Sequence, residues 1–71
     1  MTLGQRIKSA RKKKGVSQQE LGEALGSDKT LVCKYETDVV PNIPPSKLVQ
    51  IAKFLDTTPN ELLGWEEKPN A

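Results

Sequence analysis

Apolar residues recur at helical spacing in five stretches of this 71-residue chain. In the first stretch, Leu3, Ile7 and Ala10 fall on one face, which predicts an amphipathic helix over residues 2–14. Thr2 is the candidate N-cap of this helix, and Gly15 stands where a left-handed glycine commonly ends one. The chain is therefore expected to open with a helix between a hydroxyl cap and a glycine.

The middle of the chain contains two more helical patterns with almost nothing between them. Ser17 and Glu20 match a capping box, which predicts a second helix over residues 17–25. A third helix is predicted over residues 28–36, and Gly26 lies between the two. So short a connection forces the helices to cross, as in a helix-turn-helix. The residues expected to point inward are Leu21, Ala24, Leu25, Val32 and Tyr35.

Two further helices are predicted after a loop. The prolines in residues 37–45, "TDVVPNIPP", are incompatible with a helix there. Helical spacing returns over residues 46–56, with Ser46 as the expected N-cap. A last short helix is predicted over residues 59–64, after a cap at Thr58.

The five patterns together predict an all-α fold, a compact five-helix bundle with a central helix-turn-helix. One domain is expected over residues 1–65, closed by Leu62, Leu63 and Trp65, with residues 66–71 as a tail or linker. The chain is 35% hydrophobic and 28% charged. No apolar run approaches the roughly 20 residues that span a bilayer, so a cytoplasmic protein is expected.

The residue inventory argues against several kinds of chemistry. The chain has one cysteine, Cys33, and no histidine. It cannot form an internal disulfide, and it lacks the ligands for a zinc site. Nucleophilic machinery built on histidine is missing as well. We therefore expect neither an enzyme nor a bound metal or cofactor.

Charge is unevenly distributed along the chain. The net charge is +2, but residues 1–15 carry six of the eleven cations and no acid. Such segregation can create a basic face toward a polyanion. Alternatively, Lys12, Lys13 and Lys14 are a solvated helix end that offsets the helix dipole. On the first interpretation, Lys8 and Lys12 would act only as long-range steering charges toward that polyanion.

The run from Gln18 to Tyr35 resembles the helix-turn-helix of the phage lambda repressor and Cro family. "KLVQIAKFLDTTPNELLGW" is similar to the last two helices of that family, so the resemblance covers about residues 3–65. It implies a sequence-specific, double-stranded DNA-binding regulator, most simply a repressor, encoded by a bacterium or phage and associated with the nucleoid. The features that carry it are Gln18, Gly22, Gly26, Val32 and Tyr35.

The chain departs from the family pattern in two places. Gly22 stands where the family often has alanine, which suggests a close approach between the second and third helices. Asp38 stands where the family usually has glycine. The loop over residues 37–46 also lacks the basic residues that relatives often carry there.

The outward face of residues 28–36 is the expected reading surface. Only the major groove is wide enough to admit a helix, and it gives each base pair a distinct pattern. Lys29 and Lys34 are expected to donate to guanine O6 or N7, and Thr30 to hydrogen-bond a base or touch a thymine methyl. On composition alone the two lysines would be solvated surface charges.

Two neighbouring residues have alternative roles. Cys33 either contacts a base or fills a half-exposed position. Asp28 either caps the third helix or accepts from cytosine N4. Capping is favoured, because phosphates repel an unpaired carboxylate.

The resemblance implies further roles around this surface. Gln18 is expected to contact a phosphate, with Gln19, Thr37 and Asn42 as additional candidates. In relatives, an arginine of the first helix pairs with the glutamate that ends the third. Here these residues are Arg11 and Glu36.

Family members bind palindromic operators as dimers, with half-sites about 34 Å apart. The dimer contact is expected near the turn before the last helix, at Asp56, Thr57, Thr58, Pro59 and Asn60. A C-terminal oligomerisation domain outside this chain is an alternative. The rival function is an antitoxin-like or other protein-interaction module on the same fold.

Overall fold

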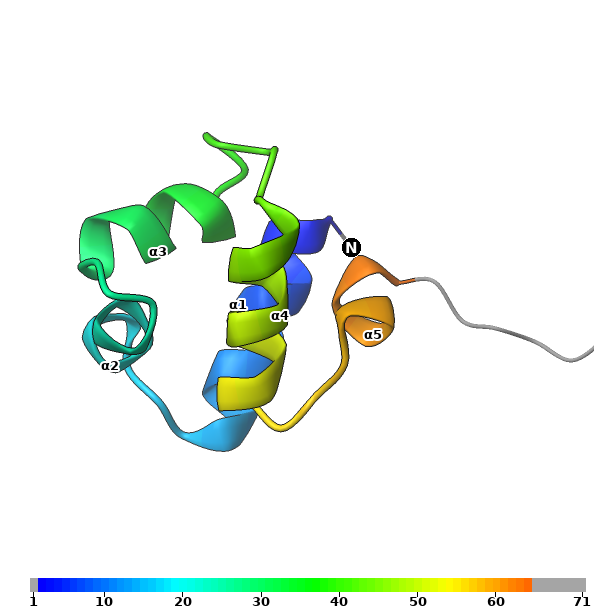
Figure 1. Cartoon of the computed structure of the whole chain (residues 1–71), viewed down its shortest axis with the longest axis horizontal. Helices are drawn as coiled ribbons and strands as arrows, with labels where there is room; N and C mark the ends of the chain where they lie inside the picture. Colours follow the sequence, from blue (N-terminus) through cyan, green and yellow to red (C-terminus); the bar gives the residue numbers. More distant parts are fainter. Residues whose placement is uncertain (1, 65–71) are drawn as a thin grey trace, which may run out of the picture.

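The computed structural model describes residues 2–64, in which the chain forms five helices and no strand. The all-α class and the five-helix bundle are confirmed (Figure 1). Trp65 and the expected tail at residues 66–71 lie outside the described residues. The helices are α1 (Leu3–Lys14), α2 (Gln18–Ala24), α3 (Lys29–Glu36), α4 (Pro45–Phe54) and α5 (Pro59–Leu63).

The first two helices begin at reciprocal capping boxes. The Thr2 hydroxyl accepts from the Gln5 N–H at 3.2 Å, while the Gln5 side chain accepts from the Thr2 N–H at 3.0 Å. Ser17 and Glu20 repeat the pattern at 3.0 and 2.9 Å, as the sequence predicted. Each box satisfies two backbone donors that a helix start leaves free.

The turn between α2 and α3 is a Schellman motif centred on Gly26. The Ser27 N–H donates to the Gly22 carbonyl at 2.8 Å, and the Gly26 N–H to the Glu23 carbonyl at 3.0 Å. Gly26 has a φ of 71°, a left-handed conformation that glycine adopts without a Cβ penalty. The turn therefore closes α2 and redirects the chain within a few residues.

The prediction for α4 was wrong at both ends. The helix begins at Pro45 and not after Ser46, with Pro44 at the N-cap position and no side-chain cap. A proline suits the first helical position because its φ is preset and its missing N–H needs no partner. The helix ends at Phe54, because Asp56 adopts a left-handed φ of 56°.

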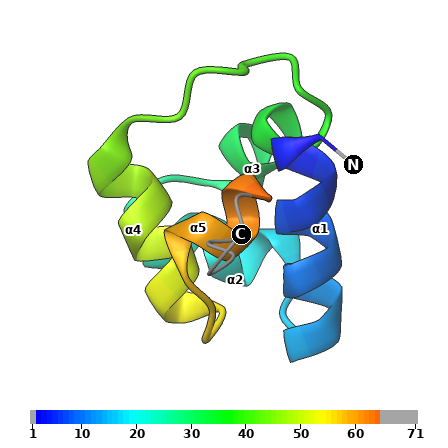
Figure 2. The ribbon, with the colours of Figure 1, turned by 90° about the vertical axis from the view of Figure 1, so that its right-hand side faces the viewer.

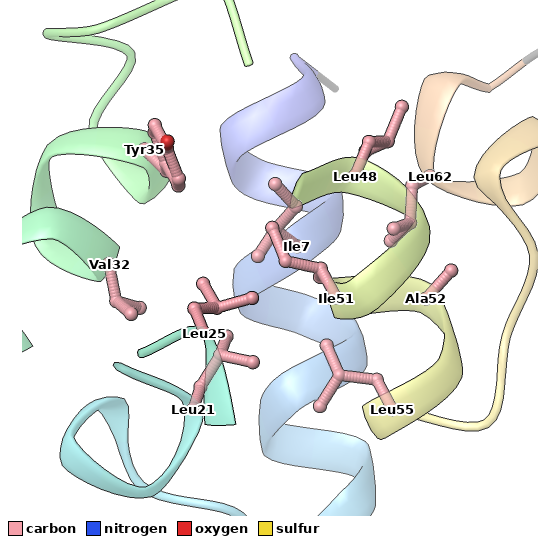
Figure 3. Close-up of a cluster of buried hydrophobic side chains, with 10 residues drawn as sticks. All are labelled: Ile7, Leu21, Leu25, Val32, Tyr35, Leu48, Ile51, Ala52, Leu55 and Leu62. Atoms are coloured by element: carbon pink, nitrogen blue, oxygen red, sulfur yellow. The ribbon is translucent and has the colours of Figure 1, made fainter. Parts of the chain in front are cut away.

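The core lies where the five helices converge, with α1 and α4 between the α2–α3 pair and α5 (Figures 1 and 3). Ala24, expected inside, is exposed, because the short α2 turns Leu21, Gly22 and Leu25 inward instead. The buried hydrophobic residues are Ile7, Leu21, Leu25, Val32, Tyr35, Leu48, Ile51, Ala52, Leu55 and Leu62.

The crossing of α2 and α3 depends on the absence of a side chain at Gly22. A Cβ there would lie 2.4 Å from the backbone C and O atoms of Asp28. Backbone atoms cannot move aside cheaply, so glycine at this position permits the close approach that its departure from the family pattern suggested. Within residues 2–64, none of the helices is long and apolar enough to cross a membrane.

Candidate nucleic-acid interface

Helix α3 has one buried face and one exposed face. Val32, Tyr35 and Glu36 are buried, as expected for the two apolar residues. The Asp28 carboxylate accepts from the Leu31 N–H at 3.1 Å, so Asp28 caps the helix. The exposed residues of the opposite face are Lys29, Thr30, Cys33 and Lys34.

An open hollow runs along this exposed face. It brings together the four residues expected to contact bases and two of those expected to contact phosphates, Gln18 and Thr37. Gln19 is not part of the lining, and its side chain donates to Glu23 at 3.4 Å. Asn42 also lies outside the lining, in the loop that leads from α3 to α4 (Figure 2).

The charged groups along the hollow are donors. Lys29 and Lys34 each present an ammonium group with three N–H donors, which suits the guanine acceptors of the major groove. Thr30 and Cys33 are small and uncharged, so a base edge can approach between the lysines. The Thr37 hydroxyl donates its single proton to the Cys33 carbonyl at 2.8 Å, so it has no proton left for a phosphate in this conformation.

Behind the hollow, Glu36 is the centre of a buried polar cluster. The Arg11 Nε donates to Glu36 Oε2 at 2.6 Å, and Arg11 Nη2 to Glu36 Oε1 at 3.3 Å. The Glu36 side chain is only 2% exposed. Arg11 also donates to the Val16 carbonyl at 2.9 Å, which satisfies the remaining edge of the guanidinium. The structure thus brings together the two residues expected to pair.

The cluster also includes Gln18, which the sequence suggested only as a contact to a DNA phosphate. Gln18 Nε2 donates to Glu36 Oε1 at 2.9 Å, across 18 positions of the chain. Gln18 is half-buried and lines the hollow as well. It therefore connects the buried ion pair to the exposed face, a link that no local sequence pattern signals.

Asp38 is a second residue whose role the sequence left open. It has a φ of 62°, and its N–H and that of Val39 donate to the Tyr35 and Lys34 carbonyls in a Schellman arrangement. The Asp38 carboxylate accepts from the Gly4 N–H at 3.1 Å and the Thr2 hydroxyl at 2.6 Å. Aspartate thus replaces the family's glycine in a left-handed position and also joins the end of α3 to the start of α1.

Val39 also lines the hollow, although the sequence gave no reason to place it there. It is 67% exposed, a high value for an aliphatic side chain. The neighbouring Val40 packs against the core instead. The end of α3 therefore turns one valine inward and the other onto the exposed face.

The turn expected to contact a second copy lies between α4 and α5. Asp56 pairs with Lys14 of α1, and the Thr57 hydroxyl donates to Glu61. Thr58 caps α5 by accepting from the Glu61 N–H at 3.2 Å. Pro59 occupies the first position of α5, and Asn60 is exposed beside it.

Four of the six basic residues of α1 occupy its last turn, where cations interact favourably with the helix dipole. Lys12, Lys13 and Lys14 are exposed, whereas Arg11 is buried by its ion pair. Lys8 and Lys12 lie on the surface of α1 with Gln5 and Ser9, and none of these residues lines the hollow of α3. The cluster is thus a solvent-exposed helix end, and a further role as a basic face toward a polyanion stays a prediction.

Solved structures similar to this chain include two regulators in complex with DNA. The P22 c2 repressor, in complex with synthetic operator 9T, superposes with a TM-score of 0.82 at 26% identity, over 93% of this chain and 98% of that one. SinR, described as a master regulator for biofilm formation and solved with DNA, superposes with a TM-score of 0.81 at 35% identity. The match covers 87% of this chain and 98% of that one.

A complex of SinR with the SinI protein gives a TM-score of 0.80 at 35% identity, and the match covers 87% of this chain and 60% of that one. No curated protein sequence matches the chain. A helix-turn-helix family model matches residues 7–62, which is most of the chain. The chain therefore belongs to the helix-turn-helix family, of the lambda repressor and Cro type.

Proposed function

We propose that this protein is a sequence-specific DNA-binding transcriptional regulator that acts as a repressor. The observation that carries the proposal is the exposed face of α3, where two lysines flank Thr30 and Cys33 while the opposite face is buried. A helix held in this way can enter the major groove without disturbing the core. The similarity to the P22 c2 repressor and to SinR, both solved with DNA, supports it.

The bases would be read by side chains of this face. Lys29 and Lys34 donate to guanine O6 or N7, and Thr30 hydrogen-bonds a base or touches a thymine methyl. Cys33, with its uncharged thiol exposed between them, contacts the same base pairs.

Phosphate contacts would set the register of α3 in the groove. Gln18 is the main candidate, because it is half-buried at the start of α2 and lines the hollow. Gln19 and Asn42 are exposed and are the additional candidates, whereas Thr37 must first give up its bond to the Cys33 carbonyl.

Two copies would bind a palindromic operator, each reading one half-site. The proposed dimer contact is the turn from Asp56 to Asn60, in which Asp56, Thr58 and Asn60 are exposed. A partner protein is a further possibility, supported by the SinR complex with SinI. The protein would work in the cytoplasm of a bacterial cell, at the nucleoid.

A salt titration of DNA binding separates this proposal from the protein-interaction alternative. A regulator that neutralises several phosphates should show a slope of log affinity against log salt steeper than about −2, together with a preference for particular sequences. A shallower slope without any sequence preference would instead indicate a module that recognises chiefly another protein.

A further inference from the structure

Side chains from three helices meet at Glu36. Arg11 comes from α1, Gln18 from α2 and Glu36 from α3, with Nε–Oε2 and Nε2–Oε1 distances of 2.6 and 2.9 Å. Arg11 and Glu36 are buried, whereas Gln18 is half-buried and borders the hollow. The cluster therefore reaches from the interior of the bundle to the exposed face of α3.

Glu36 fixes the orientation of the Gln18 amide. A carboxylate only accepts hydrogen bonds, so the amide must turn its NH₂ group, and not its carbonyl, toward Glu36. Glu36 itself cannot rotate freely, because Arg11 binds both of its oxygens and is anchored in turn to the Val16 carbonyl. One N–H of Gln18 is consumed by this bond, and the second stays available as a donor.

The electrostatics of the cluster permit an anion nearby. The negative charge of Glu36 is balanced by Arg11 at hydrogen-bond distance, so the pair as a whole is neutral. A phosphate approaching Gln18 therefore meets an oriented amide donor without a net repulsive charge behind it.

We infer that Glu36, held by Arg11, is a positioning residue for DNA binding, which orients the Gln18 amide toward a phosphate. The inference rests on the phosphate contact proposed for Gln18. The ion pair then serves two purposes. It ties α1 to α3, and it prearranges a contact on α2 so that less rotamer freedom is lost when DNA binds.

The test replaces the ion pair by apolar residues and asks whether Gln18 still contributes. Arg11→Met/Glu36→Met removes one charge of each sign, so the net charge is unchanged, and such replacements of buried pairs are often neutral for stability. The probe is the duplex that the wild-type protein selects from a random pool. Gln18→Ala is expected to weaken binding about tenfold per half-site, as for one hydrogen bond to a charged group.

The paired variant should weaken binding by a similar factor, and adding Gln18→Ala to it should cause no further loss. Wild-type affinity of Arg11→Met/Glu36→Met would overturn the positioning role. The role would also be overturned if the losses caused by the ion-pair replacement and by Gln18→Ala multiply in the triple variant. No loss for Gln18→Ala alone would instead overturn the phosphate contact itself, and the inference with it. The two failures can be distinguished because the Gln18→Ala variant leaves the ion pair of Arg11 and Glu36 intact.

A second variant keeps the test decisive if the paired variant does not fold. Glu36→Gln preserves volume but offers only one acceptor oxygen, which the charge of Arg11 should attract. The NH₂ group of the new glutamine then faces Gln18, so the Gln18 amide should flip. The flip should change the nitrogen–proton signal of the Gln18 side chain in NMR spectra and weaken DNA binding. An unchanged Gln18 signal and unchanged affinity would contradict the inference.

A control variant distinguishes a loss of DNA affinity caused by the orientation of Gln18 from a loss caused by lower stability. Ile51→Val removes one buried methyl group in α4, at a residue outside the cluster of Arg11, Gln18 and Glu36, and should lower stability modestly. All affinities are measured well below each variant's unfolding midpoint. Ile51→Val should bind like the wild type, and a loss equal to that of the paired variant would show that stability alone explains the effect.

Discussion

The two faces of α3 differ in almost every physical property. On the inner face, Val32 is fully buried and the Glu36 side chain is 2% exposed within a network of three helices. On the outer face, Lys29 and Lys34 are exposed. The two faces of this short helix thus have different roles, since one packs into the bundle and the other is exposed to a partner. Changes to the two faces should therefore have different consequences.

The largest effect is expected from Glu36→Ala on the inner face. It leaves the buried Arg11 guanidinium without its counter-ion, which typically costs about 3–5 kcal/mol of unfolding free energy. Urea unfolding followed by circular dichroism measures the loss. Lys34→Ala, two positions away and exposed, is the control and should change stability by less than about 0.5 kcal/mol. Equal effects of the two variants would erase the distinction between the faces.

A second effect should appear where α2 crosses α3. Gly22→Ala places a Cβ 2.4 Å from the backbone of Asp28 and should cost about 2–3 kcal/mol through overpacking. Gly26→Ala has open space around it and should lose only about 1 kcal/mol, because its positive φ disfavours a side chain. Thermal unfolding of both variants checks the ranking, and a milder effect at Gly22 than at Gly26 would contradict it.

On the outer face, Lys29→Ala and Lys34→Ala should leave the fold intact and change base preference. Each lysine that reads a guanine discriminates against the wrong base by about 1–3 kcal/mol. The measurement is binding to a panel of duplexes with single substitutions in the operator. A uniform loss across the panel would show that the lysines contact phosphates and not bases.

The smallest effect is expected at the end of α3. Asp38→Ala removes the acceptor for the Gly4 N–H and leaves an alanine at positive φ, and about 1 kcal/mol of stability should be lost. Asp38→Gly removes the same acceptor but relieves the backbone, so its unfolding midpoint should lie above that of Asp38→Ala. The opposite order would mean that backbone conformation is unimportant at this position.

Local sequence signals predicted the five helices, because the apolar spacing, the Ser17–Glu20 box and Gly26 act within a few residues. The start of α4 was misplaced because Ser46 matched a cap, whereas Pro44 and Pro45 determine the start of the helix. Among site residues, the outward position of Lys29 followed from the burial of Val32.

Bonds between distant residues could not be predicted from spacing. The Gln18 amide meets Glu36 across 18 positions, and Asp38 reaches back to Gly4 across 34. Lys47 donates to the Leu25 carbonyl at 2.7 Å in the same way, and so connects α4 to the end of α2. These contacts depend on how whole helices are placed, which only the packed core determines.

The central claim is that the outer face of α3 reads DNA sequence. It is tested most directly by selecting bound duplexes from a random pool with the wild-type protein and with a Lys29→Ala/Lys34→Ala variant. We predict a palindromic consensus for the wild type, with two half-sites about one helical turn apart, and loss of guanine preference at specific positions for the variant. Recovery of no consensus by the wild type, or of the same consensus by both proteins, would contradict the claim.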